Sequence, residues 1–454
     1  MNKKLLFSLN IPNSGKPRIV IVGGGFGGMN LLKKLSGDDF QIVLLDRYNY
    51  HTFQPLLYQV ATAGLEPDSI SGPYRKIIKR KKNTYFRMLK VNRVYPELNT
   101  VETTIGNLTY DYLVVATGAK VNYFNNQSIA QNAFPVKQVT HALDLRSHIF
   151  QQLEKLEVLN HEYFEEQYLN FVIVGAGPTG VEVCGALAEL KSHILPNDYP
   201  DLPIEKLKIY LIEGLDRVLP AMSKQSGETA HTYLKKMGVE VKLNCLTERY
   251  DGEIVVLNNG EKIKTDTLIW AAGVKGNLID GFDTKSIHKG KLWVNKFNQV
   301  YSNAETNHVY NNIFAIGDVA FMQSDNYSKG LPGLAQVAIQ QGRHLAKNLK
   351  KDHKRQLFKP FVYKNKGVLA TIGRNKSVAD LPNNIKLGGF AGWFIWMIVH
   401  IMFLVGFRNK IVVFANWIWN YFTFDRGIRL ILRPSTKYND MISAEMKKEM
   451  NEAN

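Results

Sequence analysis

The chain has 454 residues, a formal net charge of +17 and a hydrophobic content of 45%, which suits two or three folded domains and excludes a disordered protein. Residues 347–454 hold 19 Lys and Arg against 7 Asp and Glu, so the last quarter of the chain carries most of the charge. The same quarter is rich in Trp, Phe, Ile and Val, which favours an anionic membrane over nucleic acid as its partner.

The two cysteines and the N-terminal residues further limit the class of protein. Cys184 and Cys245 form no CxxC pair, so we expect small buried core residues and neither a disulfide framework nor a metal site. The apolar run near the N-terminus is shorter than a secretory signal requires, so the chain is expected to stay in the cytoplasm.

The first recognisable unit is strand, glycine turn, helix, strand. Residues 18–22 are a β-branched run, GGGFGG follows at 23–28, an apolar-periodic stretch runs from Met29 to Leu35, and a second strand ends at Asp46. In such a unit the glycines let a pyrophosphate approach the backbone at a helix N-terminus, and the acid accepts hydrogen bonds from ribose. The motif glycines are Gly23, Gly25 and Gly28.

The pattern recurs about 150 residues later. A strand at 171–174 meets GAGPTG at 175–180, a helix is expected over 181–194, and the next strand ends at Glu213. A carboxylate there repels a 2′-phosphate and favours NADH over NADPH, although Arg217 could soften that preference. The motif glycines are Gly175, Gly177 and Gly180. Two copies in the same context predict two bound dinucleotides, rather than glycines that merely make turns.

Other segments complete the pattern. Strands running into small-residue turns are expected at 110–120, 265–275 and 312–320, and a helix over 333–348. Two short strands are expected within 361–381.

Together these residues resemble the two-dinucleotide-binding flavoproteins and, within them, the type II NADH:quinone oxidoreductases, single-chain NADH dehydrogenases that pump no protons. The resemblance covers nearly the whole chain, and its AQxAxQ and KGxxATIG segments are more specific than the glycine motifs. The segments that carry it are GGGFGG at 23–28, FQPLLYQVATAGLEP at 53–67, VVATGA at 114–119, GAGPTGVE at 175–182, AIGD at 315–318, LAQVAIQQG at 334–342, NKGVLATIGR at 365–374 and HIMFLVGFRNK at 400–410.

The resemblance implies an α/β fold with two Rossmann-like domains. A discontinuous FAD-binding domain would comprise residues 1–125 and 300–348, an inserted NADH-binding domain 126–299, and a C-terminal membrane-association region 349–454. FAD would be the bound cofactor, NADH the electron donor, and a membrane quinone the acceptor of two electrons in a respiratory chain.

The resemblance also implies the site residues. Gly317 and Asp318 would hold the ribityl and pyrophosphate part of FAD, and Val91 its adenine end. The full FAD set is Gly23, Gly25, Phe26, Gly27, Gly28, Asp46, Arg47, Val91, Thr117, Gly118, Gly317, Asp318, Ala335 and Gln336. The NADH set is Gly175, Gly177, Gly180, Glu182, Glu213, Ala272 and Gly273. The catalytic set is Glu182, Gln336, Gln340 and Lys366, and no metal is expected.

Each catalytic role has an alternative in ordinary structure. Gln336 and Gln340 are four apart on one helix face and could simply be solvated. Lys366 could be a surface charge. Glu182, expected in the first turn of its helix, could serve as a partner of the helix dipole. His51 and His400 receive no role.

The apolar, aromatic stretches 388–407 and 412–424 are bordered by Arg and Lys. We expect two amphipathic helices lying in the membrane interface, at the cytoplasmic face of the cell membrane, rather than one spanning helix or a soluble dimer contact. A homodimer stays open. The rival functions are a ferredoxin- or rubredoxin-type reductase on the same fold and a slow flavin-bearing NADH sensor or scaffold.

Overall fold

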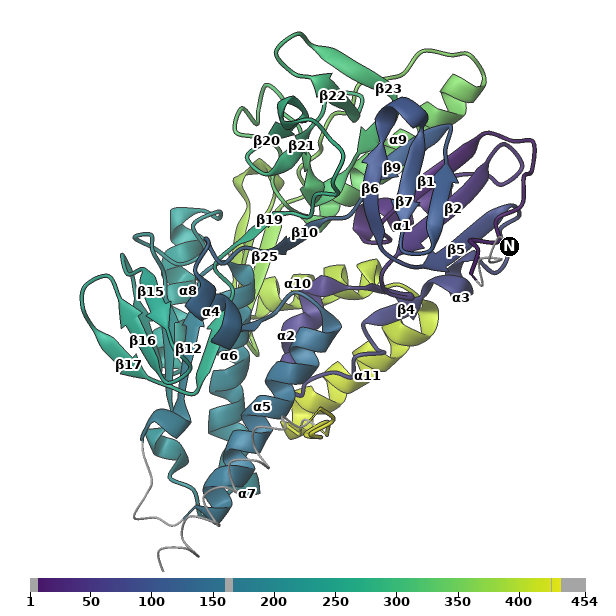
Figure 1. Cartoon of the computed structure of the whole chain (residues 1–454). Helices are drawn as coiled ribbons and strands as arrows, with labels where there is room; N and C mark the ends of the chain where they lie inside the picture. Colours follow the sequence, from purple (N-terminus) through teal and green to yellow (C-terminus); the bar gives the residue numbers. More distant parts are fainter. Residues whose placement is uncertain (1–6, 160–165, 426, 434–454) are drawn as a thin grey trace, which may run out of the picture. The chain divides into compact units, whose positions relative to one another are not determined.

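The structure, a computed structural model, describes residues 7–159, 166–425 and 427–433, so the end of the expected membrane-association region lies outside the described residues. The chain divides into two compact units. Unit 1 is the described part of residues 1–52, 72–120 and 274–365, and unit 2 is the described part of residues 53–71, 121–273 and 366–454. Each unit is built on its own mainly parallel sheet with flanking helices (Figure 1).

Unit 1 contains a six-stranded sheet that is parallel except for one antiparallel edge pair, β22 with β23. From edge to edge the strands are β22 (Gln299–Asn303), β23 (His308–Ala315), β9 (Tyr112–Val115), β1 (Arg18–Val22), β2 (Gln41–Asp46) and β5 (Thr84–Met88). The helices of the unit are α1 (Phe26–Lys34), α3 (Tyr74–Ile78) and α9 (Ala335–His353).

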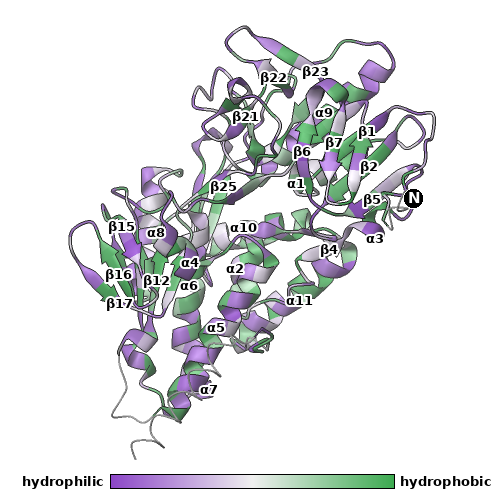
Figure 2. Cartoon of the chain, viewed as in Figure 1, coloured by the Kyte–Doolittle hydropathy of each residue, from purple (hydrophilic) through white to green (hydrophobic). Residues whose placement is uncertain are grey.

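Both faces of this sheet are buried. Because alternate residues of a strand point to opposite sides, neighbouring residues belong to different apolar clusters. Val20 and Val43 belong to one apolar cluster, whereas Ile19 and Ile42 belong to the other. The second cluster includes side chains of α1 and α9, which cover that face. Figure 2 colours the central strands β1 and β2 as hydrophobic along most of their length. The runs of Val, Ile and Leu in these strands follow from burial on both sides.

Smaller elements complete unit 1. One three-stranded sheet contains β6 (Val91–Tyr95), β7 (Thr100–Thr103) and β8 (Gly106–Thr109). A second contains β20 (Ile287–His288), β21 (Lys291–Trp293) and β24 (Ala320–Phe321), and η7 (Gly317–Val319) is a short 3-10 helix. Short strands mark where the chain passes from one unit to the other, namely β3 (Tyr50–Thr52), β4 (Ser71–Pro73), β10 (Ala119–Val121) and β19 (Val274–Gly276).

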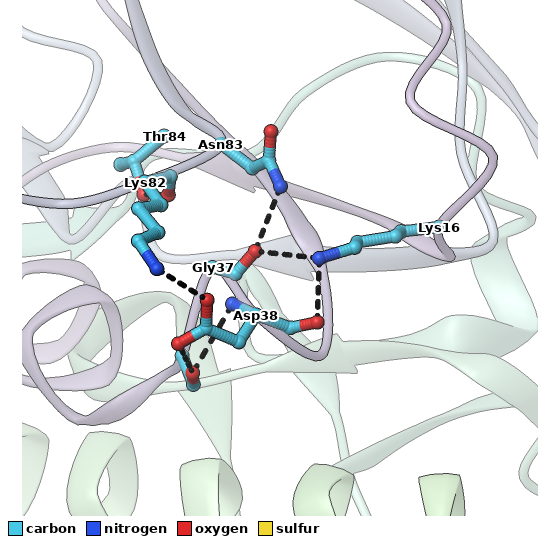
Figure 3. A network of polar contacts seen from close by, with 7 residues as sticks. Lys16, Gly37, Asp38, Lys82, Asn83 and Thr84 are labelled. Atoms are coloured by element: carbon cyan, nitrogen blue, oxygen red, sulfur yellow. Dashed lines mark hydrogen bonds and ion pairs between the residues drawn. The ribbon is translucent and has the colours of Figure 1, made fainter.

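A polar network fastens the connection between α1 and β2 (Figure 3). Lys16 Nζ donates to the carbonyl oxygen of Asp38 at 2.6 Å and to that of Gly37 at 3.3 Å. Asn83 Nδ2 also donates to Gly37 O, at 2.8 Å. A Cβ at Gly37 would lie 1.8 Å from Lys82 O, so the close approach of the two segments requires glycine.

Unit 2 contains a five-stranded, all-parallel sheet. Its strands in order are β11 (Phe134–Pro135), β18 (Thr267–Trp270), β12 (Asn170–Val174), β13 (Lys208–Ile212) and β14 (Val239–Lys242). An antiparallel sheet follows, with β15 (Thr247–Tyr250), β16 (Ile254–Leu257) and β17 (Lys262–Lys264). The helices of this part are α4 (Gln127–Asn132), α5 (Val139–Val158), α6 (Pro178–His193), α7 (Leu195–Asp198) and α8 (Lys224–Lys236).

The C-terminal part of unit 2 is a small antiparallel sheet followed by two helices. These elements are β25 (Val368–Gly373), β26 (Lys376–Asp380), β27 (Lys386–Gly388), α10 (Gly389–Phe403) and α11 (Phe407–Thr423). The sheet lies so close to α6 that a Cβ at Gly185 would be 1.6 Å from Ile372 O. This approach joins the C-terminal sheet to the nucleotide-type fold.

Helix α11 is held by residues 53–71, which include α2 (Leu57–Ala61). Asn416 Nδ2 donates to Glu66 Oε2 at 3.0 Å, and Trp417 Nε1 donates to Gln59 Oε1 at 2.8 Å. Asn409 Nδ2 donates to Ser71 O at 2.9 Å. These hydrogen bonds explain why residues 53–71 belong to unit 2.

The opposite side of both C-terminal helices is apolar and exposed. The exposed apolar residues recur every three to four positions, namely Phe390, Phe394, Ile398 and Met402 on α10 and Phe407, Ile411, Phe414, Ile418 and Phe422 on α11. No helix in the described ranges combines the length and the apolar character that crossing a bilayer needs.

The predicted strands at 18–22 and 171–174 are confirmed as β1 and β12. The helices begin earlier than predicted, α1 at Phe26 and α6 at Pro178, because the helix already starts inside the glycine motif. The two helices predicted within 388–424 are α10 and α11, and β27 is a third strand that was not predicted. The sequence pattern also missed the 20-residue helix α5.

The prediction for the cysteines is half right. Cys184 is buried, whereas Cys245 is only partly buried. The prediction was wrong for Cys245 because it lies in the turn after β14, where its Sγ donates to Leu243 O at 3.3 Å.

Candidate nucleotide sites and an aromatic pocket

The first glycine turn uses its three motif glycines for three different purposes. Gly23 has φ +100° and a Cβ there would lie 2.4 Å from Ala116 O, while a Cβ at Gly28 would lie 2.0 Å from Gly23 O. A Cβ at Gly25 would meet nothing within 4 Å, and no side chain caps α1 at this residue. Open space therefore faces the unpaired amides of a helix N-terminus, as pyrophosphate binding requires.

The second glycine turn repeats this geometry. Gly175 has φ +101° and a Cβ there would lie 2.5 Å from Ala272 Cα, while a Cβ at Gly180 would lie 1.9 Å from Gly175 O. Gly177 again faces open space and is the N-cap of α6 without a side-chain cap. The residues present thus fit a dinucleotide at both turns.

The two acids occupy equivalent positions. Asp46 accepts hydrogen bonds from the Gly24 N–H at 2.7 Å and the Tyr48 N–H at 2.9 Å. Glu213 accepts from the Ala176 N–H at 2.7 Å and the Leu215 N–H at 3.0 Å. Each carboxylate is thereby fixed beside its glycine turn, and each oxygen keeps lone pairs for ribose hydroxyls.

Two residues that the sequence reasoning missed hold the first turn. His51 Nδ1 lies 2.9 Å from Gly24 O, so the nitrogen must carry the proton in this contact. Burial of His51 lowers its pKa from 6.5 to about 4, which keeps the ring neutral. Tyr74 covers Gly24 and donates its hydroxyl to Asp46 at 3.1 Å. No sequence motif marks His51 or Tyr74, because both reach the turn from separate elements.

Most other residues expected around FAD converge on the carboxyl ends of β1, β9 and β23. The N–H of Gly317 donates to Gln341 Oε1 at 2.8 Å, and a Cβ at Gly27 would touch Ile316 at 3.1 Å. Thr117 Oγ1 donates to Asn277 O at 2.6 Å. Val91 lies on a different sheet, where it is buried at the start of β6 and pairs with Thr103.

The remaining residues of these two sets lie on several different elements. Gly118 has φ +68° and follows β9, Asp318 lies in η7, and Ala335 is the first residue of α9. Arg47 follows β2 with its guanidinium 5.8 Å from the Tyr48 ring. In unit 2, Gly273 follows Ala272 directly, and a Cβ there would lie 2.8 Å from the Phe124 ring.

Glu182 lies deeper than expected. Helix α6 begins at Pro178, so Glu182 falls in its second turn and is buried. The alternative role as a partner of the helix dipole in the first turn is therefore wrong. Burial raises the pKa of Glu182 well above its ordinary value, and the backbone N–H of Thr371 partly offsets this effect. The Trp396 indole N–H lies near the carboxyl but outside hydrogen-bonding geometry.

Glu182 lines a pocket of about 110 Å³ that lies wholly within unit 2. Three side chains of α6 at spacings of seven and four residues, those of Glu182, Glu189 and His193, line this pocket. The lining also contains the aromatic side chains of Trp393, Trp396, Trp417, Tyr421 and Phe424. None of these aromatic residues was predicted as part of a site, because the sequence pattern assigned them to lipid.

The two glutamines and Lys366 differ in their contacts and exposure. Both ends of the Gln340 amide are engaged, since Nε2 donates to Lys364 O at 2.9 Å and Oε1 accepts from the Lys364 N–H at 3.0 Å. Gln340 is thus a brace for the segment after α9 rather than a solvated residue. Gln336, one turn earlier on α9, is half-buried, and Lys366 is exposed in unit 2.

Two protein-family models match most of this chain. Residues 17–342 match the family model of pyridine nucleotide-disulphide oxidoreductases, and residues 365–426 match that of the NDH2 C-terminal domain. The chain therefore belongs to the pyridine nucleotide-disulphide oxidoreductases. Within that class it is a member of the type II NADH:quinone oxidoreductases.

The relatives span nearly the whole chain. It is 35% identical over 424 residues to the type II NADH:quinone oxidoreductase NdhA of Mycobacterium tuberculosis, covering 89% of this chain and 87% of the relative. The fold is similar to that of NDH2 from Plasmodium falciparum in complex with NADH, with a TM-score of 0.83, 23% identity and coverage of 92% and 100%. It is also similar to the sulfide:quinone oxidoreductase of Aquifex aeolicus, with a TM-score of 0.68, 19% identity and coverage of 89% and 95%.

Proposed function

We propose that this protein oxidises NADH by means of bound FAD and passes two electrons to a membrane quinone without pumping protons. The carrying observation is the pair of matching glycine turns, each with an open second glycine at an uncapped helix N-terminus. One turn would hold FAD and the other NADH. Bound FAD would supply the electron-storing chemistry that takes electrons from NADH and releases them to quinone.

The residues of the chain bind and orient the two nucleotides. The amides at the N-termini of α1 and α6 would hold the pyrophosphates, and Asp46 and Glu213 would hold the ribose hydroxyls. Gln336, Ala335 and Lys366 are proposed to lie by the flavin, with Gln340 bracing the chain between them. Tight positioning of this kind replaces a bimolecular collision, an effect on the order of several kcal/mol.

Glu182 is proposed to hold a proton that quinone reduction consumes. Its raised pKa favours the protonated form, and the pocket that it lines offers aromatic walls suited to a flat ring. No cationic side chain among the described residues lowers the pKa of Glu182, so no ion pair holds its carboxyl in the ionised form.

The change Glu182→Gln tests this role. Because an amide cannot release a carboxyl proton, we expect flavin reduction by NADH to change little, whereas reoxidation by quinone slows by at least about tenfold. Stopped-flow absorbance measures both half-reactions across a range of pH. Glu240→Gln, an exposed change on β14, is the control. Equal slowing of both half-reactions would remove Glu182 from the quinone step.

We also propose that α10 and α11 attach the enzyme to the cytoplasmic face of the cell membrane. The exposed apolar residues of both helices support this attachment, because a soluble surface rarely carries so many in one region. Attachment there would let quinone reach the enzyme from the bilayer.

The function itself is tested with purified, detergent-solubilised protein. We expect a yellow protein that oxidises NADH rapidly only when a quinone is added. A colourless preparation without flavin would overturn the proposal. Turnover with a small iron–sulfur or rubredoxin acceptor but not with quinone would favour the reductase alternative, and slow turnover with every acceptor would favour the sensor.

A further inference from the structure

Helix α3 in unit 1 carries an exposed set of positive charges. Arg75, Lys76, Lys79 and Arg80 are exposed, whereas Tyr74 and Ile78 point into the core. Arg75 and Lys76 lie on α3, Lys79 is its C-cap residue, and Arg80 follows directly. We call these four residues the α3 basic face.

Intramolecular contacts do not neutralise this face. Among the residues that the structure describes, no ion pair joins any of the four to a carboxylate. Lys82, just beyond the face, is different, because its Nζ pairs with Asp38 at 3.3 Å (Figure 3).

Further positive charge surrounds the face within unit 1. Lys81 Nζ donates to Leu35 O at the end of α1, at 2.8 Å. The pKa of Lys81 is lowered mainly by burial and also by Lys350 of α9, so the last turns of α9 lie close by. Arg87 on β5 has its pKa lowered mainly by burial and also by Arg75. The α3 basic face is thus the exposed part of a wider cationic region.

The ordinary explanation covers only part of this pattern. Lys and Arg near a helix C-terminus interact favourably with its dipole, but α3 has only five residues, and so short a dipole does not call for four cations. Anionic lipid headgroups attract clusters of four to eight basic residues in proteins that also carry an apolar attachment element. The chain supplies such an element in α10 and α11, whose exposed apolar residues are proposed above to enter the membrane.

We propose that the α3 basic face binds the anionic headgroups of the membrane on which the enzyme acts, as an electrostatic contact additional to the apolar helices α10 and α11. The inference rests on the proposed membrane function. It assigns unit 1 its own contact with lipid, which would hold that unit at the bilayer surface.

Vesicle co-sedimentation of the full-length holoenzyme tests the proposal. The vesicles are phosphatidylcholine alone or an equimolar mixture with phosphatidylglycerol. The variant R75Q/K76Q/K79Q/R80Q should bind the mixed vesicles more than about tenfold more weakly at low salt. Its binding to phosphatidylcholine alone should match that of the wild type, and the difference should vanish near 1 M salt.

The matched control removes four positive charges elsewhere, in K224Q/K235Q/K236Q/K262Q on α8 and β17. It should retain most of the binding to mixed vesicles. The charge-conserving variant R75K/R80K should bind as the wild type does, and K76Q/K79Q should lose about half of the effect on a logarithmic scale. Undiminished binding by the quadruple variant, or an equal loss in the control, would overturn the proposal.

Two further measurements separate this inference from the proposed function. NADH oxidation with a water-soluble quinone in detergent should be unchanged in the quadruple variant. The variant F394D/I418D, on α10 and α11, should weaken binding to both kinds of vesicle. If F394D/I418D binds normally, the apolar attachment fails while the α3 basic face is still judged by its own variants. Binding to RNA but not to mixed vesicles would contradict a lipid partner.

Discussion

At the residue scale, Asp46 and Glu213 make the same kind of contact because they occupy equivalent positions in the two units. Asp46 ends β2 and Glu213 directly follows β13, and both accept an N–H from the residue after the first glycine of the turn. The extra methylene of Glu213 changes neither contact. Because the turn fixes the carboxylate, its charge stands where the adenosine ribose of a nucleotide would lie.

Replacing Glu213 with Ala should therefore alter cofactor choice. Loss of the carboxylate removes both the ribose acceptor and the charge that repels a 2′-phosphate, so we expect the ratio of kcat/KM for NADH over NADPH to fall by about tenfold or more. Steady-state rates with each nucleotide measure the ratio. Asp46→Ala, in the other turn, should instead weaken retention of FAD, and an unchanged ratio in Glu213→Ala would place the nucleotide elsewhere.

At the element scale, the decisive contact in unit 2 is the approach of β25 to α6. Gly185 lies in the middle of α6, where glycine lowers helix stability, and its only evident purpose is to admit the backbone of Ile372. The same contact brings Thr371 to Glu182. Close packing of a strand on a helix thus builds the wall on which the buried carboxyl lies.

The change Gly185→Ala should disturb that wall. A methyl group 1.6 Å from the Ile372 carbonyl oxygen forces the sheet away from α6, at a cost of about 3 kcal/mol and about 6 °C in Tm. Calorimetry measures the shift. Gly427→Ala is the matched control, because a Cβ there meets nothing within 4 Å. Similar melting of both variants would show that the contact yields easily.

At the scale of the whole molecule, three histidines couple stability to pH, of which His51 and His400 are buried and His148 is half-buried. Burial lowers the pKa of His51, His148 and His400 from 6.5 to about 4. Between these values the unfolded chain binds protons that the folded protein does not. Stability is therefore fully present above about pH 6.5 and falls as the pH drops toward 4, by about 1.4 kcal/mol per pH unit for each histidine.

Thermal unfolding measured from pH 7 to pH 4 should follow this slope. His148, whose Nε2 lies 2.9 Å from Thr267 Oγ1, is the clearest probe. His148→Gln should lower Tm at pH 7 yet flatten its fall with pH by about a third. His308→Gln, on an exposed side chain, should leave the slope as it is. A slope that is the same in all three proteins would exclude His148 from the acid sensitivity.

The local parts of the nucleotide sites could be predicted, because a strand, a glycine turn and a helix follow one another within about twenty residues and leave a periodic trace. The expected glycines accordingly lie at both turns with the required open space. The environments of Glu182 and Gln340 could not be predicted in the same way. Their partners Thr371 and Lys364 lie 189 and 24 residues further along the chain, and no local pattern records such pairs.

The sequence by itself therefore determined the βαβ units, their glycine turns, the acids that end their second strands and the two apolar helices near the C-terminus. Only the tertiary structure decided that residues 53–71 hold α11, that His51 supports the first glycine turn, that Glu182 is buried, and that α3 carries an unneutralised basic face. The physical reason is range. Backbone geometry and side-chain periodicity act between near neighbours, whereas burial and charge balance depend on residues that meet only after the chain has folded.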